Sequence, residues 1–197
     1  MLGIWILTLL VFGDNGAFAA TGSIYTPAKV DMAKVRTVRL SLHNTERLQS
    51  REGKKIWLSA YTGSAKLDAT AQKRADYLAS KNKTTHARKS SDGYYNYNSI
   101  KARFSGQNIN FPKEKSGIPN FSENLARNMY KCNKADCTEE LIIAIKKWFA
   151  FFMSEKYKTS KPHYNAIASK YFKVMGMGIG ISNGKFFIVT HYVTQIK

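Results

Sequence analysis

The 197-residue chain has few cysteines, and this shortage excludes several classes of small protein. Two cysteines are too few for a miniprotein built on disulfides, and too few for a zinc site made of cysteines. Disorder along the whole chain is also excluded, because 44% of the residues are hydrophobic and 13% are aromatic. A chain of this length buries roughly 70% of its unfolded surface on folding. The protein must therefore be stabilised by one sizeable hydrophobic core.

Acidic residues are also scarce, and the surface is strongly basic as a result. Thirteen Asp and Glu residues stand against 31 Lys and Arg residues, which gives a formal net charge of +18. Such a charge attracts polyanions, whether nucleic acid, anionic lipid or cell-wall polymer. It indicates partners and says nothing about the fold.

The common motifs of catalytic and nucleotide-binding proteins are missing. The chain has no H-E-x-x-H, no G-x-S-x-G, no P-loop and no EF-hand loop. The close spacing of Cys132 and Cys137 disfavours a cysteine nucleophile. The candidates that remain are the histidines, which are His43, His86, His163 and His191.

The N-terminus has the pattern of a secretory signal peptide. The apolar run 2–12 is followed by the small-x-small sequence 17–19, which predicts cleavage near residue 20 and a signal peptide over 1–20. An uncleaved membrane anchor is the alternative, but the run is shorter than the ~20 residues that a bilayer span needs. In an oxidising compartment we expect a Cys132–Cys137 disulfide, with two free thiols as the alternative.

The remaining pattern combines helices with a C-terminal hairpin. Periodicity predicts helices over about 30–51, 67–81 and 136–157, the last of them buried nearly all round, and a long loop over 84–120 with a short helix near 99–104. Residues 175–181 alternate large residues with glycine, and Ser182-Asn183-Gly184 is typical of a turn before a partner strand over 186–193. The glycine face would let another layer approach closely. These elements predict an α+β fold, with a signal peptide (1–20), an arm and the start of the first helix (21–34), and one domain (35–197).

Several short motifs follow one another in a recognisable order along the chain. They are Leu42-His43-Asn44-x-x-Arg47, Thr85-His86, Phe121-Ser122-Glu123-Asn124-Leu125-Ala126, Trp148 with Glu155, and Pro162-His163-Tyr164-Asn165. This ordered set resembles the CAP superfamily of cysteine-rich secretory proteins, antigen 5 and pathogenesis-related proteins, also called SCP-like domains. The resemblance covers roughly residues 36–195 and is nearest to the secreted bacterial members, because the cysteines of the animal members are missing.

The resemblance implies an α-β-α sandwich with helices on a small, mainly antiparallel sheet, and a shallow cleft. Carried over by motif, the cleft is lined by His86, Glu123, Glu155 and His163. Relatives bind a divalent cation, often zinc, and the equivalent ligands here would be His86 and His163. Neutral imidazoles are good zinc ligands, and the carboxylates could orient them or a bound water.

Other motif residues have structural roles by the same comparison. Asn44 and Arg47 are expected to tie the first helix to its neighbours, with His43 in the same structural motif. His191 has no counterpart in the family pattern.

The chain also departs from the family pattern. Ser122 stands where glycine is usual, and Tyr164-Asn165-Ala166 replaces the Thr-Gln that follows the second histidine in plant and vertebrate members. The 36 residues between His86 and Glu123 exceed the usual spacing, so the 84–120 loop could cover the cleft.

Three functions fit these observations. The first is a secreted binding module, a monomer or weak dimer, whose cleft holds a cation, a lipid or another small ligand and whose basic surface docks on an anionic polymer or membrane. Nucleic acid is a less favoured partner. The alternative is a metal-assisted hydrolase of peptide or cell-wall substrates, in which Glu123 or Glu155 activates a cation-bound water. The third is a structural secreted protein whose four cleft residues have no present function.

Overall fold

The computed structural model describes residues 29–49, 58–93, 95–112 and 117–196. The expected signal peptide and most of the expected arm lie outside the described residues. The helices are α1 (Met32–Gln49), α2 (Ala65–Lys81), α3 (Tyr97–Ser105), α4 (Thr138–Ser154) and α5 (Pro162–Ile167), with short 3-10 turns η2 (Ser90–Asp92) and η3 (Glu155–Tyr157). The strands are β1 (Thr62–Gly63), β2 (Phe121–Met129), β3 (Val174–Ser182) and β4 (Lys185–Val193).

The four strands form one sheet in the order β1-β3-β4-β2. Strand β4 pairs antiparallel with both β3 and β2, and only the short β1 runs parallel to its neighbour. The predicted hairpin is confirmed, with Asn183 and Gly184 at its turn at φ values of 49° and 67°. Two consecutive positive φ values suit the turn that joins two right-twisted strands. The sheet is therefore mainly antiparallel, as expected.

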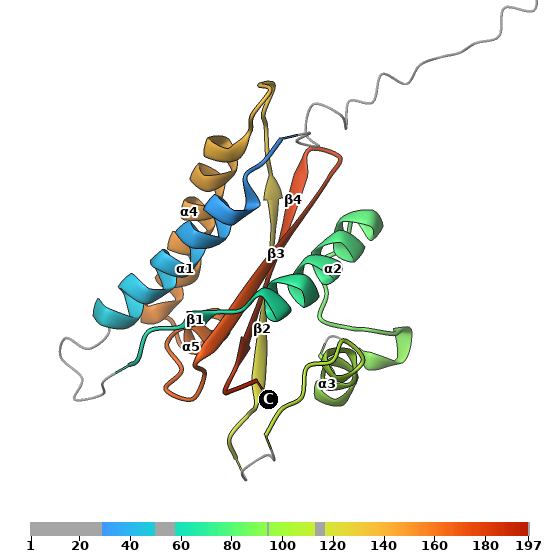
Figure 1. Cartoon of the computed structure of the whole chain (residues 1–197), viewed down its shortest axis with the longest axis vertical. Coiled ribbons are helices and arrows are strands. Elements are labelled where there is room, and N and C mark those ends of the chain that lie inside the picture. The colour runs from blue at the N-terminus through green and yellow to red at the C-terminus, as the bar shows by residue number, and fades with distance from the viewer. Residues whose placement is uncertain (1–28, 50–57, 94, 113–116, 197) are drawn as a thin grey trace, which may run out of the picture.

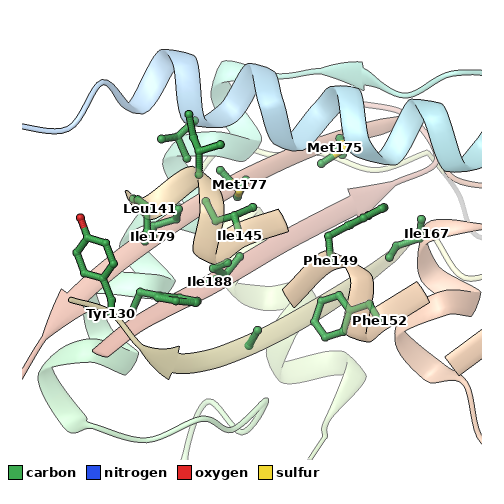
Figure 2. Packing of buried hydrophobic residues seen from close by; sticks show 14 of the residues in the cluster. Tyr130, Leu141, Ile145, Phe149, Phe152, Ile167, Met175, Met177, Ile179 and Ile188 are labelled. Carbon is green, nitrogen blue, oxygen red and sulfur yellow. The ribbon is translucent and has the colours of Figure 1, made fainter. Parts of the chain in front are cut away.

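Helices cover both faces of the sheet, which confirms the predicted α-β-α sandwich. Helices α1 and α4 lie together on one side, and α2 lies on the other (Figure 1). On the α1/α4 side, one apolar row of α4 packs on the large residues of β3 and on β4 (Figure 2). We expected α4 to be buried nearly all round, but its outer side is open to solvent. Ile143 and Phe151 are about half exposed there.

The glycines of β3 bring α2 onto the other face of the sheet. A Cβ atom placed on Gly178 would overlap the α2 backbone at Ala71 and Gln72, and neighbouring glycines meet α2 in the same way. Because the helix backbone lies directly on the strand, only glycine fits there. The predicted close approach of a second layer is confirmed.

The 84–120 segment contains more regular structure than a loop. The short helix expected near residues 99–104 is present as α3, and Asn96 caps it by accepting a hydrogen bond from the Ser99 backbone at 3.0 Å. Its buried residues Ile100 and Phe104 pack in one cluster with Phe121 of β2. The segment therefore extends the α2 side of the sandwich.

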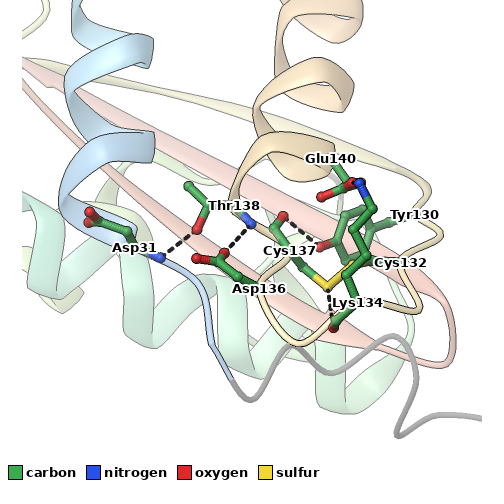
Figure 3. Close-up of a disulfide and its surroundings, with 8 residues drawn as sticks. All are labelled: Asp31, Tyr130, Cys132, Lys134, Asp136, Cys137, Thr138 and Glu140. Atoms are coloured by element: carbon green, nitrogen blue, oxygen red, sulfur yellow. Dashed lines mark hydrogen bonds and ion pairs between the residues drawn. A yellow bond between two sulfur atoms is a disulfide. The ribbon is translucent and has the colours of Figure 1, made fainter.

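The predicted disulfide joins Cys132 and Cys137 just before α4 (Figure 3). The Tyr130 hydroxyl donates to the Cys137 carbonyl at 3.0 Å, and Asp136 accepts from the Thr138 backbone at 2.8 Å. The bond therefore closes a tight turn at the start of a helix and does not link distant parts of the fold. No helix in the described segments is long and apolar enough to cross a membrane.

Candidate functional site

Glu123 is the centre of a buried ionic cluster on the α2 side of the sheet. Its Oε1 accepts from His86 Nδ1 at 2.8 Å, and its Oε2 accepts from His191 Nε2 at 3.0 Å. The guanidinium of Arg88 donates to both oxygens, at 3.3 and 2.5 Å. All four hydrogen bonds reach a carboxylate whose side chain is inaccessible to solvent. Glu123 is thereby fully occupied by donors from the chain itself.

The charge state of this cluster follows from its contacts. Burial alone would raise the pKa of Glu123, but hydrogen bonds from His191 and His86 and the charge of Arg88 outweigh it, so the pKa lies well below its usual range. Burial lowers the pKa of His191 despite the neighbouring carboxylate. A neutral His191 that donates from Nε2 has its lone pair on Nδ1, which lies 2.9 Å from the Thr70 hydroxyl. The cluster is thus an anion held by an arginine and two imidazoles.

A second histidine–glutamate pair forms at the junction of α4 and α5. Glu155 follows the last residue of α4, and its Oε1 accepts from His163 Nδ1 at 2.6 Å. Its Oε2 accepts from the backbone N–H groups of His163 and Tyr164 at 3.0 and 3.3 Å. The His163 ring stacks on Phe152, with 4.3 Å between ring centroids. The carboxylate is therefore buried with a partner.

The two His–Glu pairs lie on either side of the edge strand β2. Glu123 and Asn124 are consecutive in this strand, so their side chains point to opposite faces of the sheet. Glu123 faces His86, whereas the Asn124 amide donates to the His163 carbonyl at 3.1 Å and to the Tyr192 hydroxyl at 3.2 Å. Within residues 29–49, 58–93, 95–112 and 117–196, no three His, Cys, Asp or Glu residues form a group that could hold a metal ion. The four predicted residues thus form two pairs.

In both pairs the carboxylate contacts the same ring nitrogen of its histidine, Nδ1. A carboxylate only accepts hydrogen bonds, so Nδ1 of each ring carries the proton of that bond. The ring nitrogen with the lone pair is then Nε2, in both His86 and His163. Metal-binding histidines commonly have this arrangement, with the second ring nitrogen donating to a carboxylate. The donor chemistry of each pair fits one imidazole ligand to a divalent metal, with its carboxylate orienting the ring.

The first-helix motif fastens α1 to the chain that follows it. Asn44 and Tyr61 exchange hydrogen bonds through the Asn44 side chain and the Tyr61 backbone, at 3.2 and 2.7 Å. The fully buried guanidinium of Arg47 donates to the carbonyls of Ser59, Ile167 and Ser169 at 2.6–2.8 Å. His43 is also fully buried, and it bonds the Tyr192 hydroxyl at 2.8 Å. Burial holds the pKa of His43 well below its usual range, so the ring is neutral.

Arg39 lies two turns before Arg47 on the same helix and, unlike Arg47, has no hydrogen-bond partner among the described residues for its buried charge. It is fully buried, and all three of its guanidinium nitrogens are without a hydrogen-bond partner. The group lies over the rings of Phe149 and Phe152, 5.0 and 5.7 Å from their centroids. Burial lowers the pKa of Arg39 to about 10. Two aromatic faces replace only part of the hydration that this cation has lost.

We therefore expect Arg39→Met to stabilise the protein by about 1–3 kcal/mol, since an apolar side chain of similar length removes the cost of an unpaired buried charge. Urea unfolding measures the change. Arg47→Met is the matched control, because it removes an equally buried arginine that does have carbonyl partners, and it should destabilise. An Arg39→Met protein less stable than the parent would show that the ring contacts compensate the buried charge.

Two members of the site were missed from sequence. His191 lies opposite Glu123 in the β2–β4 register, but no strand over 121–129 was predicted, so the pairing had no sequence signal. Arg88 lies two residues after His86 and reaches the same carboxylate, which spacing alone does not reveal.

The sequence of this chain is similar to that of a known protein family. A sequence model of the cysteine-rich secretory protein family (CAP) matches residues 40–196. A search of curated proteins found no match.

Several solved structures have a similar fold. An outer surface protein of Borrelia burgdorferi is 15% identical with a TM-score of 0.54, and the match covers 85% of this chain and 97% of that one. An extracellular SCP-domain protein of Bacillus anthracis is 13% identical with a TM-score of 0.50, and the match covers 83% of this chain but only 41% of that one. The protein NaASP2, solved with Zn²⁺, is 11% identical with a TM-score of 0.51, and the match covers 82% and 80% of the two chains. At these identities the likeness concerns the fold alone.

Proposed function

Because the chain belongs to the cysteine-rich secretory protein family (CAP), we propose that it is an extracellular binding protein. In this proposal His86 and His163 hold a divalent cation such as zinc through their Nε2 atoms, and the basic surface docks on anionic membranes or polymers. The observation that carries the cation site is the matched pair of Nδ1–carboxylate hydrogen bonds, at 2.8 and 2.6 Å. Two similar structures come from an extracellular and an outer surface protein, and a third was solved with Zn²⁺, which supports the proposal.

The roles of the residues follow from their contacts. His86 and His163 would be the two protein ligands, and solvent or a ligand group would complete the coordination of the metal. Glu123 and Glu155 orient the rings and fix the proton on Nδ1. Bound zinc would supply a Lewis acid that attracts an anionic or carbonyl group. With only two protein ligands, the site would be open and its affinity modest.

The carboxylates favour binding over hydrolysis. A general base must be able to take a proton from a water molecule near the substrate. Glu123 already accepts four hydrogen bonds, its side chain is inaccessible to solvent, and its pKa is lowered. Glu155 accepts three hydrogen bonds from the start of α5. Both carboxylates are therefore better suited to position histidines than to activate water.

Calorimetric titration of the mature protein with zinc tests the cation site. We expect binding to one site that is nearly abolished in both His86→Ala and His163→Ala, because a two-histidine site has no redundancy. Glu155→Gln should weaken binding by about 10- to 100-fold, as changes behind a metal ligand usually do. Circular dichroism confirms that each variant is folded. Unchanged zinc affinity in both histidine variants would refute the site.

Exposed residues on the outer side of α4 support the proposed docking on membranes. Ile143 and Phe151 are exposed there beside the exposed Lys146 and Lys147. Apolar side chains flanked by lysines suit the interface of an anionic bilayer, and the net charge of +18 adds long-range attraction.

We expect binding to vesicles that contain phosphatidylserine to weaken steeply between 50 and ~300 mM salt, because screening shortens the reach of the surface charge. Vesicle co-sedimentation measures this, with Ile143→Ser/Phe151→Ser and Lys146→Gln/Lys147→Gln each expected to reduce binding. Equal binding to neutral vesicles, or no effect of either double variant, would count against docking through α4.

A further inference from the structure

A separate basic pocket lies between α2, α3 and the chain after His86. Its volume is about 310 Å³, at the lower end of the range for small-molecule sites. Four cationic side chains line it, which are Lys73, Arg74, Arg88 and Arg103. Tyr77 of α2 and Phe104 of α3 add aromatic surface to the lining. The pocket thus combines several positive charges with a small apolar area.

The positive charges of this pocket are poorly compensated. No acidic residue is among the described residues that line it. Behind the pocket, Glu123 contacts Arg88 and is already shared with two histidines. Lys73 and Arg103 lie exposed at the rim. An anion entering the pocket would therefore meet a net positive field.

Arg74 gives a second, independent indication. The residue is only 8% exposed, and its NH2 group donates to the carbonyls of Thr85 and Ala87 at 2.5 and 2.9 Å. Its buried Nε has no hydrogen-bond partner. Arg74 thus holds the chain before Arg88 in place, and the carboxylate that acts on its charge, Glu123, is already bonded to Arg88. A buried guanidinium with an unpaired Nε has lost part of its hydration, so an anion bound beside it would stabilise it.

We propose that this pocket binds a small ligand that carries a phosphate ester group. Guanidinium groups match the geometry of phosphate oxygens, and two arginines that are fixed by other contacts lose little freedom when they bind one. The oxyanion would lie among Arg74, Arg88 and the rim cations, and the rest of the ligand would pack on Tyr77 and Phe104. This pocket needs neither a metal nor the Nε2 atoms of the histidines, although Arg88 connects it to the Glu123 carboxylate.

The test uses the folded, metal-free protein in ~150 mM salt with three probes, which are phenyl phosphate, inorganic phosphate and phenol. We expect NMR titration to show saturable binding of phenyl phosphate with amide shifts at Thr70 and Gln107, weaker binding of inorganic phosphate, and none of phenol. Lys73→Gln/Arg103→Gln should weaken phenyl phosphate binding by about tenfold or more, because these charges contact the ligand directly. Both side chains are exposed, so this variant should fold normally.

Lys146→Gln/Lys147→Gln on α4 removes the same charge from the other side of the sheet and is the control, with an expected change of less than about twofold. Equal weakening in both double variants would mean that the net charge alone attracts the ligand, and would overturn the proposal. Binding of phenol as tight as that of phenyl phosphate would overturn it as well. Zinc binding by the Lys73→Gln/Arg103→Gln protein should equal that of the parent, which keeps the two sites distinguishable.

Discussion

Replacing Gly178 by alanine should prevent the protein from folding, or destabilise it by more than about 3 kcal/mol. The added methyl group would overlap the α2 backbone at Ala71 and Gln72, and a backbone cannot turn away as a flexible side chain can. Helix α2 would have to leave the sheet, and with it the layer that positions His86. The measurement is urea unfolding of the purified variant, together with its yield of soluble protein.

Gly63→Ala is the matched control for this prediction. Gly63 lies in the neighbouring strand β1, and a Cβ atom there would meet only Leu40 at 3.4 Å, which is an acceptable contact. This variant should remain within about 1 kcal/mol of the parent. A Gly178→Ala protein as stable as Gly63→Ala would mean that α2 does not rest on β3 as described.

Glu123→Gln should cost about 3–5 kcal/mol of folding stability, because it leaves Arg88 buried without its counter-ion. The Arg88 side chain is only 8% exposed, and Glu123 is its carboxylate partner. Glu139→Gln is the control, because its ion pair with Lys34 is on the surface, with both side chains more than half exposed, and should contribute little. Urea unfolding at neutral pH compares the two.

The same carboxylate predicts the sign of a pH effect. The pKa of Glu123 is lower in the folded protein than the usual 4.5, so the unfolded chain takes up its proton first as the solution is acidified. Its contribution is therefore complete above about pH 4.5 and is lost as the pH falls through the lowered value. Stability of the parent should fall more steeply than that of Glu123→Gln below pH 4.5. Parallel curves for the two proteins would contradict the role given to Glu123.

The parts of the fold that sequence predicts are those with local signals. The hairpin follows from the alternation in β3 and from Asn183-Gly184, and α2 follows from its 3.6-residue period. Strand β2 was not predicted, because Glu123 and Asn124 interrupt its apolar alternation with the polar groups that the site needs. A strand that buries polar side chains departs from the alternation of apolar and polar residues by which strands are predicted.

The resemblance to a known family supplied the four candidate residues, which are His86, Glu123, Glu155 and His163. Their pairing and their surroundings were not predicted. The contacts of His191 and Arg88 depend on a register and a chain path that only the folded protein defines. Arg39 gave no signal either, because a basic residue on a helix is ordinarily taken to be solvated.

The most direct test of the proposed cation site is a crystal structure of the mature protein soaked with zinc, with diffraction measured on both sides of the zinc absorption edge. The prediction is one anomalous peak bonded to Nε2 of both His86 and His163 at about 2.0–2.1 Å, with Glu123 and Glu155 still on the Nδ1 atoms. A peak bonded to only one of the two histidines, or zinc bound elsewhere with both Nε2 atoms uncoordinated, would contradict it.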